Sequence, residues 1–149
     1  MLQYSLPGFE MALADHSHTA IGMMGERWLM TKLAAQGLHV SLTQPGERRG
    51  DLRVVNPSTG EVRLVEVKTA RKGRDGKWRF TLVKKGHTDH RRADVIVLLA
   101  VTASGKVIPF IVPVSDLAAK HHAVITSHPA QYAGRLAKYR CAPGARMVV

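Results

Sequence analysis

The chain has 149 residues, 45% of them hydrophobic and 22% charged, which suits one globular domain with a single core. Its 22 Lys and Arg against 11 Asp and Glu give a net charge of +11, which favours a polyanionic partner. No stretch reaches the roughly 18 consecutive apolar residues of a membrane helix, and the first residues lack a secretory-signal pattern. A lone cysteine, Cys141, excludes an intrachain disulfide, so we expect a reducing, cytoplasmic setting.

The predicted elements begin with a helix that precedes a run of strands. Thr19 is the expected N-cap of this helix, which runs to about Gln36 and stops at Gly37. Strands are predicted over residues 38–42, 51–55, 61–69 and 77–83, with the turn NPSTG joining the second strand to the third.

The second half of the chain is also predicted to mix strands and helices. Residues 94–101 form a continuous apolar run typical of a buried strand, and 107–112 form another strand. Short helices are expected over 87–93, after Ser115, and over 129–140. This order predicts an α/β or α+β core with a mixed sheet, in a single domain covering residues 1–149.

Positive charge is concentrated in residues 71–92, which hold nine Lys or Arg against two acids. We expect these nine to contact a nucleic-acid backbone, although a basic solubilising surface is the alternative. They are Arg71, Lys72, Arg74, Lys77, Arg79, Lys84, Lys85, Arg91 and Arg92. Trp78 and Phe80 lie among them, and strand alternation favours their packing on the sheet over stacking on bases. The eight histidines lack zinc-finger spacing with the single cysteine and are interpreted as surface residues.

A hairpin over residues 49–70 places charged side chains where valine or threonine would be ordinary. If Val55 faces Val62 across the turn, Asp51 faces Glu66 with Cα atoms roughly 4.5 to 5.5 Å apart. Lys68, two residues after Glu66, then points to the same face. A slip of one residue would turn Asp51 to the other face, so the hypothesis depends on the register.

Two opposed carboxylates repel one another, and a cation between them would relieve that repulsion. Mg²⁺ is the natural candidate, with Mn²⁺ as a substitute, because it takes one or two carboxylates together with water and phosphate oxygens. Lys68 is then placed to orient or deprotonate a water, or to neutralise charge on a phosphorane. The alternative is a salt-bridge cluster of Asp51, Glu66 and Lys68 on a solvated face.

A third acid, Glu26, falls within the first helix on a face that also carries Gly22, Leu29, Met30 and Leu33. An inward-facing carboxylate needs a partner, and the site on the sheet would supply one. A glutamate at the edge of the apolar stripe that reaches water or an arginine is the equal alternative.

The residues GE at 25–26, GDL at 50–52, VEVKTA at 65–70, RRADVIVLLAV at 91–101 and IPFIVPVSDL at 108–117 resemble the PD-(D/E)XK nuclease superfamily. Within it the chain is most similar to small endonucleases of the group I intron homing type and to archaeal-type Holliday junction resolvases. The resemblance covers about residues 18–118, which leaves 119–149 as a basic C-terminal extension. It implies a restriction-endonuclease-like core with a central mixed β-sheet flanked by helices.

The resemblance also implies roles for the charged residues. Asp51 and Glu66 would bind Mg²⁺, Lys68 would activate water, and the helical Glu26 would complete the site. Gly50 stands where the superfamily pattern has proline, a position without a chemical role.

The function expected from these observations is a metal-dependent DNA endonuclease, either structure-directed like a junction resolvase or site-specific like a homing enzyme. RNA as a substrate stays open. Because cutting two strands needs two active sites, a homodimer or a dimer of dimers is expected. The alternative is a non-catalytic nucleic-acid-binding module on the same fold.

Overall fold

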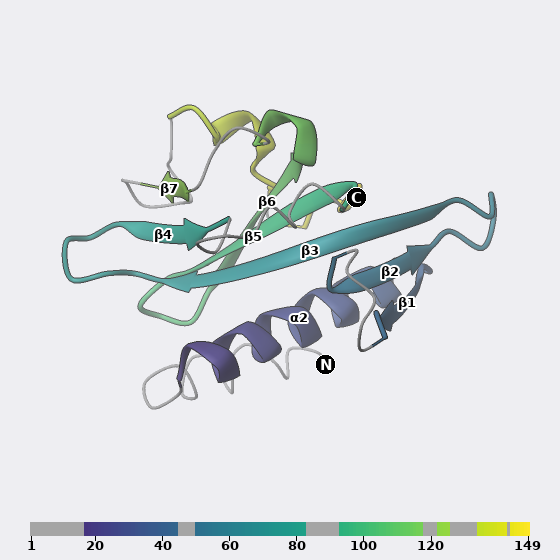
Figure 1. Ribbon diagram of the computed structural model, residues 1–149, viewed down its shortest axis with the longest axis horizontal. Coiled ribbons are helices and arrows are strands. Elements are labelled where there is room, and N and C mark those ends of the chain that lie inside the picture. The colour runs from purple at the N-terminus through teal and green to yellow at the C-terminus, as the bar shows by residue number, and fades with distance from the viewer. Residues whose placement is uncertain (1–16, 45–49, 83–92, 118–121, 126–133, 143) are drawn as a thin grey trace.

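A computed structural model describes residues 17–44, 50–82, 93–117, 122–125, 134–142 and 144–149 (Figure 1). The predicted short helix at 87–93 and the basic residues Lys84, Lys85, Arg91 and Arg92 lie outside this part of the chain, apart from Ala93. The elements are α2 His18–Ala35, β1 His39–Leu42, β2 Leu52–Val55, β3 Val62–Arg71, β4 Trp78–Thr81, β5 Val95–Val101, β6 Val107–Pro113 and β7 His122–Ile125, with 3-10 turns at Val114–Asp116 and Ala137–Tyr139.

The main sheet has five strands in the order β1-β2-β3-β5-β6. β1, β2 and β3 form an antiparallel meander, β3 pairs with β5 in parallel, and β6 returns antiparallel to β5. The parallel pair needs a crossover, and the chain from β3 to β5 supplies it by way of β4. The predicted α/β class with a mixed sheet is confirmed (Figure 1).

Helix α2 begins two residues earlier than the sequence indicated. Ser17, not Thr19, is the N-cap, and its hydroxyl accepts a hydrogen bond from the N–H of Ala20 at 3.3 Å. Both residues are good caps by type, so local chemistry alone did not discriminate between them. The other end agrees with the prediction, because the helix finishes at Ala35 and Gly37 follows with a φ of 88°.

Two apolar layers cover the two faces of the sheet. On one face, Leu29 and Leu33 of α2 pack with Val65 and Val67 of β3, all of them buried. On the other face, Phe110 of β6 belongs to a second layer that also contains β4. Every residue of β5 is buried because helix and β4 cover its two sides, which explains its continuous apolar run.

The strand β4 leaves the main sheet and pairs antiparallel with β7, a strand that the sequence did not predict. Trp78 and Phe80 are 1% and 2% exposed in the second apolar layer, so their predicted packing on the sheet is confirmed. The indole N–H of Trp78 donates to the carbonyl of Val101 at 2.8 Å, which fixes β4 against the end of β5.

Two helix predictions near the C-terminus are wrong in the described residues. The chain after β6 makes a 3-10 turn at Val114–Asp116, so Ser115 lies within the turn and does not cap a following helix. The stretch expected to be a basic helix contains a 3-10 turn at Ala137–Tyr139. An isolated bridge between Arg140 and Phe110 holds this stretch against β6, so a tertiary contact replaces the helical hydrogen bonds. No helix in the described ranges is long and apolar enough to cross a membrane.

Candidate active site

The predicted hairpin register is confirmed by four pairs, from Val55 opposite Val62 to Leu52 opposite Val65. The predicted pair of Asp51 opposite Glu66 is not part of this ladder, because Asp51 lies one residue beyond the last pair. Its N–H donates to the carbonyl of Val65 at 2.8 Å, and its carboxylate Oδ2 accepts from the N–H of Val67 at 2.8 Å. The side chain of Asp51 therefore continues the hydrogen-bonding of β3 at the point where the backbone of β2 diverges.

The two edges of β3 are paired over different lengths in the described residues. The pairing of β3 with β2 ends at Val65, whereas the pairing with β5 continues to Arg71. Asp51 is half-buried at the point where β2 and β3 separate, which we call the fork. Its carboxylate is held against the peptide that joins Glu66 to Val67. Backbone donation to an ionised carboxylate fixes its orientation.

Gly50 has a structural role that the sequence did not reveal. Its φ is 80°, and a Cβ at this position would lie 2.9 Å from the carbonyl oxygen of Val65. Proline, which holds φ near −65°, could not adopt this conformation. Glycine at position 50 is therefore required by the close approach of the chain to β3.

Glu66 and Lys68 project from the same face of β3. Val65 and Val67, which alternate with them, are buried in the layer under α2, so Glu66 and Lys68 point to the opposite face. Lys68 Nζ lies 3.2 Å from Glu66 Oε1, and the two side chains are 28% and 14% exposed. The pair is substantially desolvated, so its charges interact more strongly than those of a surface ion pair.

Helix α2 brings Glu26 into the electrostatic reach of the fork. Burial raises the pKa of the Glu26 carboxyl, the negative charge of Asp51 raises it further, and Lys68 lowers it. The helix can approach β3 this closely because Gly25 faces Thr69, where an added Cβ would lie 1.8 Å from the hydroxyl oxygen. Glu26 therefore lies within electrostatic reach of Asp51 and Lys68, although α2 covers the face of β3 opposite the one that carries Glu66 and Lys68.

The acidic side chains do not form a metal site with three or more protein ligands in the described residues. Within the described ranges, no group of three or more His, Cys, Asp or Glu side chains is close enough to hold a metal ion. An ion at the fork would have Asp51 and Glu66 as its protein carboxylates, with other oxygens completing its shell. That donor set fits Mg²⁺, which usually keeps several waters and one or two carboxylates.

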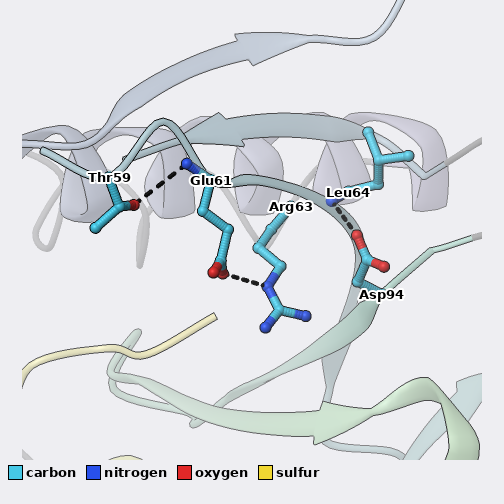
Figure 2. A network of polar contacts seen from close by, with 5 residues as sticks. All are labelled: Thr59, Glu61, Arg63, Leu64 and Asp94. Atoms are coloured by element: carbon cyan, nitrogen blue, oxygen red, sulfur yellow. Dashed lines mark hydrogen bonds and ion pairs between the residues drawn. The ribbon is translucent and has the colours of Figure 1, made fainter. Parts of the chain in front are cut away.

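A second acid and base pair on the same hairpin gives a reference for the first (Figure 2). Glu61 Oε1 accepts from Arg63 Nε at 2.8 Å, with both side chains well exposed at 59% and 44%. Nearby, Asp94 accepts from the N–H of Leu64 at 2.8 Å on the β5 side of β3 (Figure 2). Asp94 and Asp51 thus hold opposite edges of the same strand, and Asp51 does so at the peptide that joins Glu66 to Val67.

Two of the basic residues that follow β3 contact other side chains of the protein. Arg79 is engaged in an ion pair with Asp75 at 2.6 Å, and the Nζ of Lys72 lies 5.8 Å from the ring centroid of Trp78. Arg71, Arg74 and Lys77 are the other predicted nucleic-acid contacts in the described ranges; the first two are exposed and the third is half-buried. Together they follow directly from the strand that carries Glu66 and Lys68.

Arg53 is a residue near the fork that sequence reasoning overlooked. Its neighbours Leu52 and Val54 are buried under α2, so Arg53 projects to the face that carries Glu66 and Lys68. Sequence alternation could have predicted this orientation. The register pairs Arg53 with Leu64, which lies two residues before Glu66 and therefore shares its face of the sheet.

Comparison with solved structures shows that this chain is similar to a bacterial homing endonuclease, I-Ssp6803I. The TM-score is 0.65 at 16% sequence identity, over 83% of this chain and 86% of the other. No protein-family model matches the sequence, and comparison with curated proteins gives no match. The chain therefore shares the α/β fold of a nuclease, which agrees with the predicted fold class.

Proposed function

We propose that this protein is a metal-dependent DNA endonuclease of the PD-(D/E)XK type. The observation that carries the proposal is the fork itself: the Asp51 carboxylate is fixed on the N–H of Val67, the residue that stands in sequence between the ion-paired Glu66 and Lys68. The fold supports it, because a solved structure with a similar fold is that of a homing endonuclease. The net charge of +11 supports a nucleic acid as substrate.

Each side chain has a distinct role in this proposal. Asp51 and Glu66 would hold Mg²⁺, or Mn²⁺ in its place, and the ion would act as a Lewis acid on a phosphate oxygen when bound. Lys68 Nζ would orient the attacking water or stabilise the negative charge that develops on the phosphorane. Glu26, whose carboxyl has a raised pKa, would act as a supporting group that can accept a proton near the fork.

The basic residues that follow β3 would hold the DNA backbone. Arg71 ends the strand that carries Lys68, and Lys72, Arg74 and Lys77 follow it, so a DNA backbone bound there would lie next to the end of that strand. Cutting both strands of a duplex, or a symmetric junction, would need two copies of the site, and we therefore propose a homodimer or a dimer of dimers.

Cleavage assays with supercoiled plasmid, linear duplex and a four-way junction test the proposal, with Mg²⁺, with Mn²⁺ and with a chelator. Asp51→Asn keeps an oxygen that can accept from Val67 but removes the charge, and Glu66→Gln removes the second carboxylate's charge. We expect each to lower cleavage by at least about 10²-fold while DNA binding is retained. Glu61→Gln and Arg63→Met, in the exposed pair on the same hairpin, are matched controls and should cut normally.

The non-catalytic binding module is the second candidate, favoured by the 3.2 Å contact in which Lys68 already neutralises Glu66. The two functions differ in one measurable result. If the parent protein binds these DNAs but cuts none of them with either metal, the enzyme proposal fails and the binding module stands. The substrate panel also separates a structure-directed enzyme from a site-specific one.

A further inference from the structure

A cavity of about 420 Å³, partly open to solvent, lies between α2, the first residues of β6 and a C-terminal segment that comprises residues 140–142 and 144–147. The C-terminal segment is fixed at both ends of the cavity. Its Cys141 N–H donates to the carbonyl of Pro109 at 2.8 Å, and the amide of Gln36 makes two hydrogen bonds with the backbone of Met147, at 2.9 and 2.7 Å. The cavity is therefore framed by specific contacts between segments distant in sequence.

The lining of this cavity combines apolar walls with positive charge. Trp28, Val107 and Met147 are buried and form part of the walls. Three basic side chains, Lys32, Lys106 and Arg140, also line it, and none of the described residues in the lining is Asp or Glu. The ammonium of Lys32 lies 5.5 Å from the centroid of the Trp28 ring, so positive charge lies over an apolar surface.

None of the residues that line the cavity belongs to the fork. Glu26, Asp51, Glu66 and Lys68 are absent from the lining, although Glu26 and Trp28 are close in sequence on α2. A nucleic-acid backbone would complement the cations but not the apolar interior, because phosphates and sugars are polar. A ligand that matches both features needs an apolar body and one anionic group.

We propose that this cavity binds a small anion with an apolar body, such as a medium-chain or aromatic carboxylate. The apolar body would occupy the space between Trp28, Val107 and Met147, where it loses contact with water. Its carboxylate would lie toward Lys32 and Lys106, which makes binding sensitive to ionic strength. This site is independent of the proposed cleavage reaction and stands even if the protein cuts no DNA.

Cys141 lines the cavity and is the only cysteine in the chain, so its labelling reports on occupancy. Burial raises the pKa of this thiol, so little thiolate forms at neutral pH and labelling by a maleimide is slow enough to follow. Sodium decanoate, below its micelle concentration, should slow the labelling at least about 5-fold and raise the melting temperature by a few degrees. Decyltrimethylammonium, which has the same body and the opposite charge, should do neither.

Variants locate the effect in the cavity. The double change Lys32→Gln and Lys106→Gln should weaken protection by decanoate about 10-fold or more, whereas Lys138→Gln, outside the lining, should leave it unchanged. Ala35→Phe, at an exposed lining position, should remove protection by filling the space. Trp28 fluorescence in a Trp78→Phe background gives a second signal for binding.

Three results would overturn the proposal. The first is equal protection by decanoate and decyltrimethylammonium, which would show that charge is not recognised. The second is no protection by decanoate in the folded parent protein. The third is protection of Cys141 by duplex DNA but not by decanoate, which would assign the cavity to the nucleic-acid surface.

Discussion

Substituting Gly25 with alanine would test the contact that brings α2 to the fork. The added Cβ would lie 1.8 Å from Thr69 Oγ1 and 2.9 Å from Thr69 Cβ. Rotation of the threonine side chain can move Oγ1, but the Cβ is fixed by the backbone of β3. The helix and the strand would therefore have to separate by roughly 1 Å in a closely packed interior.

The size of the effect follows from two opposing terms. Alanine is better than glycine in a helix by about 1 kcal/mol, and overpacking costs about 1 to 3 kcal/mol. Gly22 lies in the same helix with nothing within 4 Å of its added Cβ, so Gly22→Ala gains the first term without the second. Gly25→Ala should therefore be less stable than Gly22→Ala by about 2 kcal/mol.

Urea unfolding followed by circular dichroism measures both free energies of unfolding. Adding Thr69→Ala to Gly25→Ala should recover part of the loss, because it removes Oγ1 but keeps Cβ, and the two changes should couple by more than about 0.5 kcal/mol. If cleavage is found, Gly25→Ala should also lower it, since Glu26 moves with the helix. Equal unfolding free energies for Gly22→Ala and Gly25→Ala would refute the close packing of α2 on Thr69.

Other predictions concern the fork, β4 and the charge on α2. Gly50→Ala combines a φ of 80° with a Cβ 2.9 Å from the backbone of β3, so it should lower the free energy of unfolding by about 2 to 3 kcal/mol. Gly60→Ala has a strained φ of 75° but open space around its Cβ, so it should cost less. Urea unfolding of both variants measures the difference. Trp78→Phe removes the indole donor to the buried carbonyl of Val101 and should cost about 1 to 3 kcal/mol, and a loss below about 0.5 kcal/mol would contradict that hydrogen bond. Burial and Asp51's negative charge raise the pKa of Glu26 above its ordinary 4.5, so its folded form binds the proton more tightly and its contribution to stability falls as the pH rises through the folded pKa. Glu26→Gln should therefore gain stability over the parent protein across that range when no divalent metal is present, as unfolding measured from pH 4 to 8 will show; an unchanged difference across the range would argue against a buried, charged Glu26.

The strands of the hairpin could be predicted because their information is local. Turn residues in NPSTG set the length of the connection, and alternation of apolar residues set which side chains share a face. The pairs from Val55 opposite Val62 to Leu52 opposite Val65 followed from these two rules. Extending the same rule by one residue failed, because Asp51 bonds to Val65 and Val67 instead of continuing the regular ladder.

Elements without a local signal were harder to predict. Strand β7 exists through its pairing with β4, a partner more than forty residues earlier in the chain, as in the pair Trp78 and Ile125. The stretch near Ala137–Tyr139 has a helix-compatible composition, but its bridge to Phe110 draws it against β6. In both cases a long-range contact outweighed the weak local preference.

By itself, the sequence determined the mixed α/β class, the limits of α2 to within two residues, the hairpin register and the common face of Glu66 and Lys68. These features depend on periodicity, turn chemistry and charge, all of which can be identified within a short stretch of sequence. Only the tertiary structure decided that Asp51 caps the edge of β3 and that Gly25 lets Glu26 approach Asp51 and Lys68. The tertiary structure also created the cavity that Trp28 lines. Such features require segments from different parts of the chain to meet at a few ångströms, and no local pattern in the sequence encodes that distance.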